Sequence, residues 1–176
     1  MDNRYISDSK SAVKTVVINS MAVALVFIAA MFVHIRIPVA GAGGMIHIGD
    51  LPLFVFAMLC GRKTGAIAGA FGLALFDFLS GWSLWAPFTL VIGGAMGYVV
   101  GLTAENNPED KAVPYGISVM AACLFTIVGY YIAEGFLYGN WLTPAASVPV
   151  NFLQVTLPAV LALPVARRLK RIGWQI

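Results

Sequence analysis

Apolar residues fill most of this 176-residue chain in long runs, and polar residues mark where each run ends. The runs cover about 16–37, 46–61, 64–79, 85–102, 113–137 and 148–166. At a helical rise of 1.5 Å per residue, they approach or exceed the ~30 Å core of a bilayer, although the second run is barely long enough. The pattern predicts an all-α polytopic membrane protein, a compact bundle of six transmembrane helices that forms one domain over residues 1–176.

The composition supports the same class of protein. Hydrophobic residues make up 60% of the chain and charged residues 11%, whereas a soluble domain carries about 25% charged residues. So few charges cannot cover a water-facing surface, and their clustering at a few points argues for membrane topology and against nucleic-acid binding. Cys60 and Cys123 lie in or beside apolar runs, so we expect packing roles and no disulfide.

The basic residues predict the orientation of the bundle. Cytoplasmic loops of membrane proteins are enriched in lysine and arginine. Only Arg36 lies on one side of the predicted bundle, whereas the other side holds the following basic residues: Lys10, Lys14, Arg62, Lys63, Lys111, Arg167, Arg168, Lys170 and Arg171. Six spans place both termini on the same side, so both termini are predicted to be cytoplasmic.

Glycines carry two further predictions. Gly61, Gly65 and Gly69 recur every four residues, as do glycines 93, 97 and 101, and such stripes allow helices to approach closely. By contrast, the segment 38–44 combines a proline with three glycines and predicts a loop that folds back over a cavity.

Polar side chains gather near the predicted outer ends of the spans. In a six-helix bundle these groups lie at one level, where they would surround a small polar ring by stacking and hydrogen bonding. Tyr130 and Tyr131 stand four and three residues before Glu134, so at least one tyrosine shares its helix face. The predicted binding residues are His47, Asp50, Asp77, Trp85, Tyr131, Glu134, Asn151 and Gln154.

Each of these residues has a structural alternative. The tryptophans suit an interfacial aromatic belt, and Asp50 suits a helix N-cap. Asp77 or Glu134 would be neutralised if His34 or Arg36 lay beside it. Asn151 and Gln154 suit hydrogen bonding between helices. An acid in an apolar helix is costly and usually functional or paired, which favours binding for the two acids.

Motifs for catalysis are missing from the sequence. It has no HExxH, no CxxC pair, no Walker glycine loop and no GxSxG, and we predict neither a metal nor a cofactor. One alternative is a small intramembrane enzyme that acts on a lipid with Asp77, Glu134 and His47 as acid–base groups. Another is a packing protein that binds no ligand.

Four short motifs carry a family resemblance. They are His47-Ile-Gly-Asp50, the Asp77-Phe-Leu-Ser-Gly81 that follows the first glycine stripe, Trp85-Ala-Pro-Phe-Thr89, and Asn151-Phe-Leu-Gln154. In this order they resemble the substrate-binding S components of energy-coupling factor (ECF) vitamin transporters. The similarity is to the riboflavin-transporter-like branch, which also holds the proposed hydroxymethylpyrimidine and pyridoxine carriers.

The resemblance implies a function and partners. Such a subunit is not an enzyme: it binds a vitamin or precursor from outside a bacterial cell membrane and works with a transmembrane scaffold T component and two ATPases. Hydroxymethylpyrimidine or pyridoxine is the favoured ligand, with riboflavin as the alternative. Small residues on the first helix are implied to contact the scaffold, and here these are Ser20, Ala22, Ala24, Ala29 and Ala30.

Overall fold

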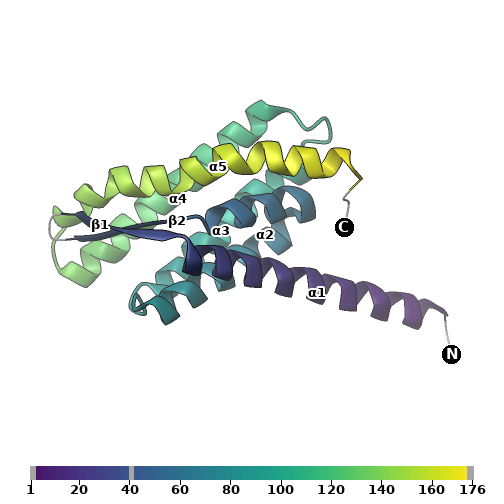
Figure 1. The fold of residues 1–176 in the computed structure, drawn as a ribbon, viewed down its shortest axis with the longest axis horizontal. Helices are drawn as coiled ribbons and strands as arrows, with labels where there is room; N and C mark the ends of the chain where they lie inside the picture. Colours follow the sequence, from purple (N-terminus) through teal and green to yellow (C-terminus); the bar gives the residue numbers. More distant parts are fainter. Residues whose placement is uncertain (1–2, 40–41, 174–176) are drawn as a thin grey trace.

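The computed structural model describes residues 3–39 and 42–173, which form a helical bundle with a short β-hairpin at one end (Figure 1). The elements are α1 (Asn3–Phe32), β1 (His34–Val39), β2 (Ala42–His47), α2 (Asp50–Ser80), α3 (Ala86–Glu105), α4 (Ala112–Tyr138), the short 3-10 helix η1 (Thr143–Ser147) and α5 (Val148–Arg171). In this part of the chain, five helices are long and apolar enough to cross a membrane.

The second helix is interrupted at Gly61, whose φ of 82° and ψ of −174° are not helical. A β-carbon at Gly65 would lie 2.7 Å from the Cβ of Ala57, and one at Gly69 would lie 2.9 Å from the Cδ1 of Leu53. From the first contact to the second, the residue number rises from 65 to 69 after Gly61 and falls from 57 to 53 before it. The segments before and after Gly61 therefore run antiparallel, and they correspond to two of the predicted apolar runs.

The two glycine stripes face each other across α2 and α3. A β-carbon at Gly65 would lie 2.5 Å from the carbonyl oxygen of Gly97, and one at Gly93 would lie 2.5 Å from that of Gly69. No side chain fits between the backbones at these points. The prediction that the stripes mark close helix contacts is confirmed.

The sequence prediction was wrong for residues 33–47. The first helix ends at Phe32 and the second begins at Asp50, whereas the sequence predicted a helix to residue 37, a loop over 38–44 and a new helix from 46. Instead β1 pairs antiparallel with β2, from His34 opposite His47 to Val39 opposite Ala42. Residues 40 and 41 of the predicted loop lie outside the described residues.

The hairpin has a physical reason in its composition. Ile35 and Ile37 alternate with His34 and Arg36, which is the period of a strand, and β-branched residues favour extended backbone. Strand pairing also satisfies backbone polar groups that lipid leaves unsatisfied. The all-α prediction is therefore correct for the bundle and wrong for this segment.

The hairpin and the chain ends lie at opposite ends of the bundle. Figure 1 shows the first turns of α1 and the last turns of α5 at one end, with β1 and β2 at the other. The first helix packs its small residues Ala22 and Ala30 inward with Val26, all fully buried. Large apolar side chains such as Phe71, Leu124 and Val160 are exposed on the outer surface, as expected of a protein whose solvent is lipid.

Candidate ligand-binding site

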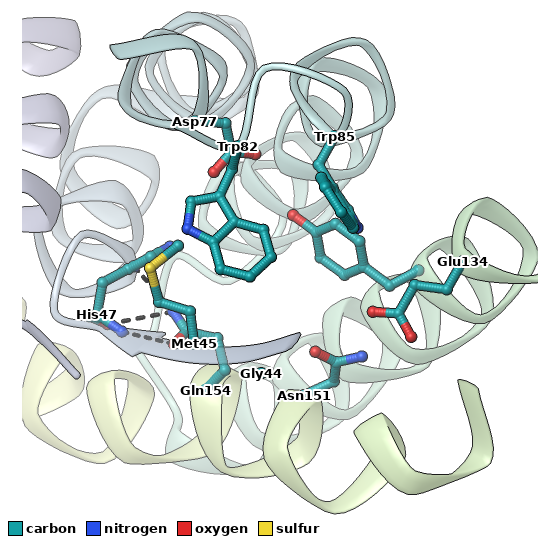
Figure 2. Close-up of a pocket in the computed structure, with 10 residues that line it drawn as sticks. Gly44, Met45, His47, Asp77, Trp82, Trp85, Glu134, Asn151 and Gln154 are labelled. Carbon is teal, nitrogen blue, oxygen red and sulfur yellow. Dashed lines mark hydrogen bonds between the residues drawn. The ribbon is translucent and has the colours of Figure 1, made fainter. Parts of the chain in front are cut away.

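A small cavity lies beneath the hairpin, at the end of the bundle opposite the chain ends. Its volume is about 60 Å³. Strand β2, helices α2, α4 and α5, and the turn between α2 and α3 all contribute to it, and Figure 2 shows the side chains that converge there. The lining residues are Gly44, Met45, His47, Asp77, Trp82, Trp85, Tyr130, Glu134, Asn151 and Gln154.

Gln154 connects α5 to the strand and to the start of α2. Its Oε1 accepts a hydrogen bond from the backbone N–H of His47 at 2.7 Å, and its Nε2 donates to Asp50 Oδ2 at 2.8 Å. The same amide nitrogen lies 2.9 Å from His47 Nδ1. The side chain of Gln154 thus holds one wall of the cavity in place.

His47 is a neutral group in this network. Burial lowers the pKa of its imidazole from 6.5 to about 4, although hydrogen bonding to its own backbone opposes the shift. Because an amide nitrogen only donates, Nδ1 of His47 accepts from Gln154, and the ring proton resides on Nε2. The edge of the ring packs against Phe76, with ring centroids 5.2 Å apart.

Asp77 is anchored by a hydroxyl on the next helix. The hydroxyl of Thr89 donates a short hydrogen bond to Asp77 Oδ2, and it also lies 2.8 Å from the hydroxyl of Tyr130. The three residues come from α2, α3 and α4; Asp77 and Thr89 are buried and Tyr130 is partly buried. This chain of polar groups joins three helices at the level of the cavity.

Glu134 makes a similar contact on the opposite side. Its Oε2 accepts a hydrogen bond from Ser147 at 2.8 Å. Asn151 follows one turn later on α5 and also lines the cavity. Figure 2 shows Asp77 beside the Trp82 ring and Glu134 apart from it, near Asn151, and the partners of the two carboxyl groups are the hydroxyls of Thr89 and Ser147.

Two tryptophans form the aromatic part of the site. The rings of Trp82 and Trp85 meet edge to face, with centroids 4.9 Å apart. The guanidinium of Arg36 lies 5.9 Å from the Trp82 ring centre and donates to the backbone carbonyl of Ser80 at 3.0 Å. Arg36 thereby ties β1 to the turn that carries both tryptophans.

Most of the predicted binding residues meet at this cavity, and two do not line it. His47, Asp77, Trp85, Glu134, Asn151 and Gln154 all line the cavity. Asp50 lies behind Gln154 and is 1% exposed. The hydroxyl of Tyr131 points elsewhere and donates to the carbonyl of Trp141 at 2.6 Å.

Four lining residues were not among the predicted binding residues: Gly44, Met45, Trp82 and Tyr130. Tyr130 stands four residues before Glu134, a spacing that places both on one helix face, so the sequence contained the signal. The sequence did not decide between Tyr130 and Tyr131, because residues three or four positions before Glu134 can both share its helix face. Gly44 and Met45 depend on the hairpin, which the sequence analysis did not predict.

The predicted scaffold-contact residues differ in exposure. Ala22 and Ala30 are buried inside the bundle and are not available to a partner. Ser20 and Ala24 are exposed and line an apolar groove between α1 and the second half of α2, whereas Ala29 is half-buried. The groove is lined by Val16, Asn19, Ser20, Val23, Ala24, Phe27, Ile67, Phe71 and Leu75.

The fold and the site define a class of protein: a helical membrane protein with a small cavity, lined by polar and aromatic side chains, at one end of its bundle. The family model for the S component of ECF-type riboflavin transporters matches residues 10–171. The chain belongs to this family, as its motifs predicted. It is an S component of a vitamin or precursor transporter and a multi-pass membrane protein, and the family membership excludes the lipid enzyme as its class.

Individual relatives agree with the family. The thiamine precursor transporter HmpT of Lactococcus lactis subsp. cremoris is 29% identical over 173 residues, which cover 98% of this chain and 93% of HmpT. An uncharacterised protein of Pyrococcus woesei is 35% identical over 105 residues, or 60% of this chain and 69% of that protein. A solved structure of a bacterial ECF transporter S component superposes with a TM-score of 0.69 at 20% identity, covering 90% of this chain and 96% of that one.

Proposed function

We propose that this S component binds a single-ring thiamine precursor, hydroxymethylpyrimidine, in the cavity beneath the hairpin. The observation that carries the proposal is the convergence of carboxyl, amide and indole groups from separate elements on one cavity. Indole rings stack on a flat heterocycle, and carboxyl and amide groups bond to its edges. The name of the relative HmpT supports the choice of a thiamine precursor.

The size of the cavity argues against riboflavin, although the family model is named for it. A cavity of ~150 Å³ is known to hold benzene, and this one measures about 60 Å³. Even a single ring requires side chains to move, and Met45 has the flexibility to do so. A three-ring flavin would require a much larger rearrangement. Pyridoxine, also a single ring, is the second candidate.

Binding to the purified protein tests the proposal. We expect calorimetry to show tighter binding of hydroxymethylpyrimidine than of pyridoxine, and little or no binding of riboflavin. Asp77→Asn, Glu134→Gln and Asn151→Ala should each weaken binding roughly ten- to hundredfold, because each removes or alters one hydrogen-bond partner of the ligand. Cys123→Ala is the control for a buried change elsewhere. Binding of all three site variants within twofold of the parent would place the ligand elsewhere.

For the topology, we propose six membrane crossings, with the two segments of α2 counted separately and both termini in the cytoplasm. The antiparallel contacts around Gly61 and the placement of the chain ends in Figure 1 support an even number of crossings. In a variant without native cysteines, Leu142→Cys should react with an impermeant reagent from outside, and Glu109→Cys should not. Both positions are exposed. Labelling of Glu109→Cys in intact cells would contradict this orientation.

We further propose that the chain works with a transmembrane T component and two ATPases, since its own sequence has no phosphate-binding loop. The groove around Ser20 and Ala24 is the proposed docking face, because small residues permit close helix approach. Ala24→Trp should reduce co-purification with the T component and leave ligand binding unchanged. Met21→Trp is a matched control, since Met21 is exposed on α1 and does not line the groove. Equal co-purification of both variants would refute this face.

A further inference from the structure

The two carboxyl groups of the cavity share an arrangement that bears on the chemistry of the ligand. Asp77 uses Oδ2 to accept from Thr89, and Glu134 uses Oε2 to accept from Ser147. Within the described part of the chain, the second oxygen of each has no hydrogen-bond partner from the protein, and neither is among the buried unpaired atoms. Each residue therefore offers one acceptor oxygen to the cavity.

Positive charge is missing from the lining. Among the described residues that line the cavity there is no lysine or arginine, and His47 is neutral because burial lowers the pKa of its ring to about 4. The guanidinium of Arg36 stacks on Trp82, donates to the carbonyl of Ser80, and does not line the cavity. An anion in this cavity would face two acidic side chains without a cation to neutralise it.

We propose that the site selects a neutral or cationic ring that carries hydrogen-bond donors on two separate edges, and that it excludes phosphate esters of the same ring. Asp77 accepts from a donor on one edge, and Glu134 accepts from a donor on the other, because the two acids line the cavity from different helices and lie apart in it (Figure 2). This inference rests on the proposed function and specifies the substrate class of the same site.

The exclusion of phosphate follows from charge and desolvation. A phosphate monoester carries a charge of about −1.5 to −2 at neutral pH, and removal of a charge from water is costly unless it is paired. In this cavity the phosphate group would face the carboxyl groups of Asp77 and Glu134, which offer negative charge or acceptor oxygens and no hydrogen-bond donors. Selectivity arises from this repulsion as much as from attraction to the preferred ligand.

Calorimetry with four ligands tests the inference on the unmodified protein. The ligands are hydroxymethylpyrimidine, its phosphate ester, an analogue without the amino group, and an analogue with methyl in place of hydroxymethyl. We expect the phosphate ester to bind at least about a hundredfold more weakly, and each analogue about ten- to hundredfold more weakly. The inference would be overturned if the phosphate ester bound within threefold of hydroxymethylpyrimidine, or if both analogues bound as tightly as hydroxymethylpyrimidine. Either result would leave the proposed function standing.

Variants then assign each donor to one acid. In Asp77→Asn, one of the two analogues should bind as tightly as hydroxymethylpyrimidine does. In Glu134→Gln, the other analogue should do so. The reason is that a pairwise coupling vanishes when either partner is removed. Equal penalties in both variants and the parent would contradict the assignment. If none of hydroxymethylpyrimidine, pyridoxine and riboflavin binds the folded protein, the proposed function fails as well, which distinguishes the two failures.

Discussion

The amide nitrogen of Gln154 lies 2.8 Å from Oδ2 of Asp50, although the two residues are 104 positions apart. The contact joins the interior of α5 to the first residue of α2, and the same glutamine holds the backbone of β2. Asp50 is 1% exposed, and its other oxygen has no partner. Gln154 is therefore the only described group that satisfies this buried carboxyl, and it also supports the hairpin over the cavity.

We predict that Gln154→Leu lowers both stability and ligand affinity. The substitution leaves both oxygens of Asp50 without a partner, and a buried unsatisfied group costs about 1–3 kcal/mol. The backbone N–H of His47 loses its acceptor as well. Thermal unfolding in detergent should show a lower midpoint, and calorimetry should show a weaker hydroxymethylpyrimidine complex. Thr156→Val, on the same helix, is the control because its hydroxyl bonds only to its own helix backbone. Equal midpoints for the two variants would contradict the role of Gln154.

Acid should destabilise the protein through His47. The pKa of this imidazole is about 4 in the folded protein and 6.5 when unfolded, so the unfolded chain takes up the proton first as the pH falls. The free energy of unfolding should therefore decrease from pH 6.5 to about pH 4, by up to about 3 kcal/mol from this group. His47→Gln should flatten this part of the pH profile.

His34→Gln provides the matched control for that profile, since His34 also packs its ring on Phe76. Its Nδ1 lies 3.0 Å from the carbonyl of Met31, and its charge contributes less than burial does to the lowered pKa of His47. The acid-dependent loss of stability should persist in this variant. A profile that flattens in His34→Gln and stays unchanged in His47→Gln would show that the wrong histidine has been chosen.

A methyl group at Gly97 should destabilise the bundle strongly. Its β-carbon would overlap the backbone carbonyl of Gly65, and backbone atoms on a packed helix cannot move aside locally. We expect Gly97→Ala to cost at least 1–3 kcal/mol, the range for overpacked sites. Gly116→Ala is the control, because no atom lies within 4 Å of a β-carbon there. Comparison of the two unfolding midpoints decides the prediction, which fails if Gly97→Ala is as stable as Gly116→Ala.

Asp110 should stabilise the end of the bundle that carries the chain termini. Its Oδ1 lies 2.9 Å from Lys170 Nζ, and its Oδ2 lies 3.2 Å from Arg167 Nε. Burial alone would raise the pKa of Asp110, but the hydrogen bonds and charges of Lys170 and Arg167, with Tyr115, outweigh it and lower the pKa below 3.8. Asp110→Asn should lower the free energy of unfolding by up to about 1 kcal/mol; asparagine tolerates the positive φ of 52°.

The stability difference between the parent protein and Asp110→Asn should depend on pH in a defined direction. A carboxyl with a lowered pKa contributes stability above its unfolded pKa, and the contribution disappears as the pH falls through the folded value. The difference between parent and Asp110→Asn should therefore be full at neutral pH and vanish in strong acid. Glu109→Gln serves as the control, since the Glu109–Lys111 pair is about two-thirds exposed. A difference that grows in acid would contradict the prediction.

Much of the site was predictable because polar groups in an apolar chain are few. Asp77 and Glu134 stand out in helices that are otherwise apolar, and both line the cavity. The choice between Tyr130 and Tyr131 was not predictable, because their spacings from Glu134 both fit one face. The rotation of α4 against its neighbours decides which tyrosine turns inward, and that rotation results from packing between helices.

The sequence by itself determined the class of fold, the membrane-spanning runs and the glycine contacts, because hydrophobicity and side-chain size act locally along the chain. Only the tertiary structure decided that residues 34–47 form a hairpin, that Tyr130 and not Tyr131 lines the cavity, and that Gln154 meets Asp50. The hairpin depends on backbone pairing between two strands. The other two features depend on side chains that separate helices bring together, since a buried amide needs a particular carboxyl. Such pairings are set by the packed bundle as a whole, which is why Ala22 and Ala30 face inward while Ser20 and Ala24 remain exposed.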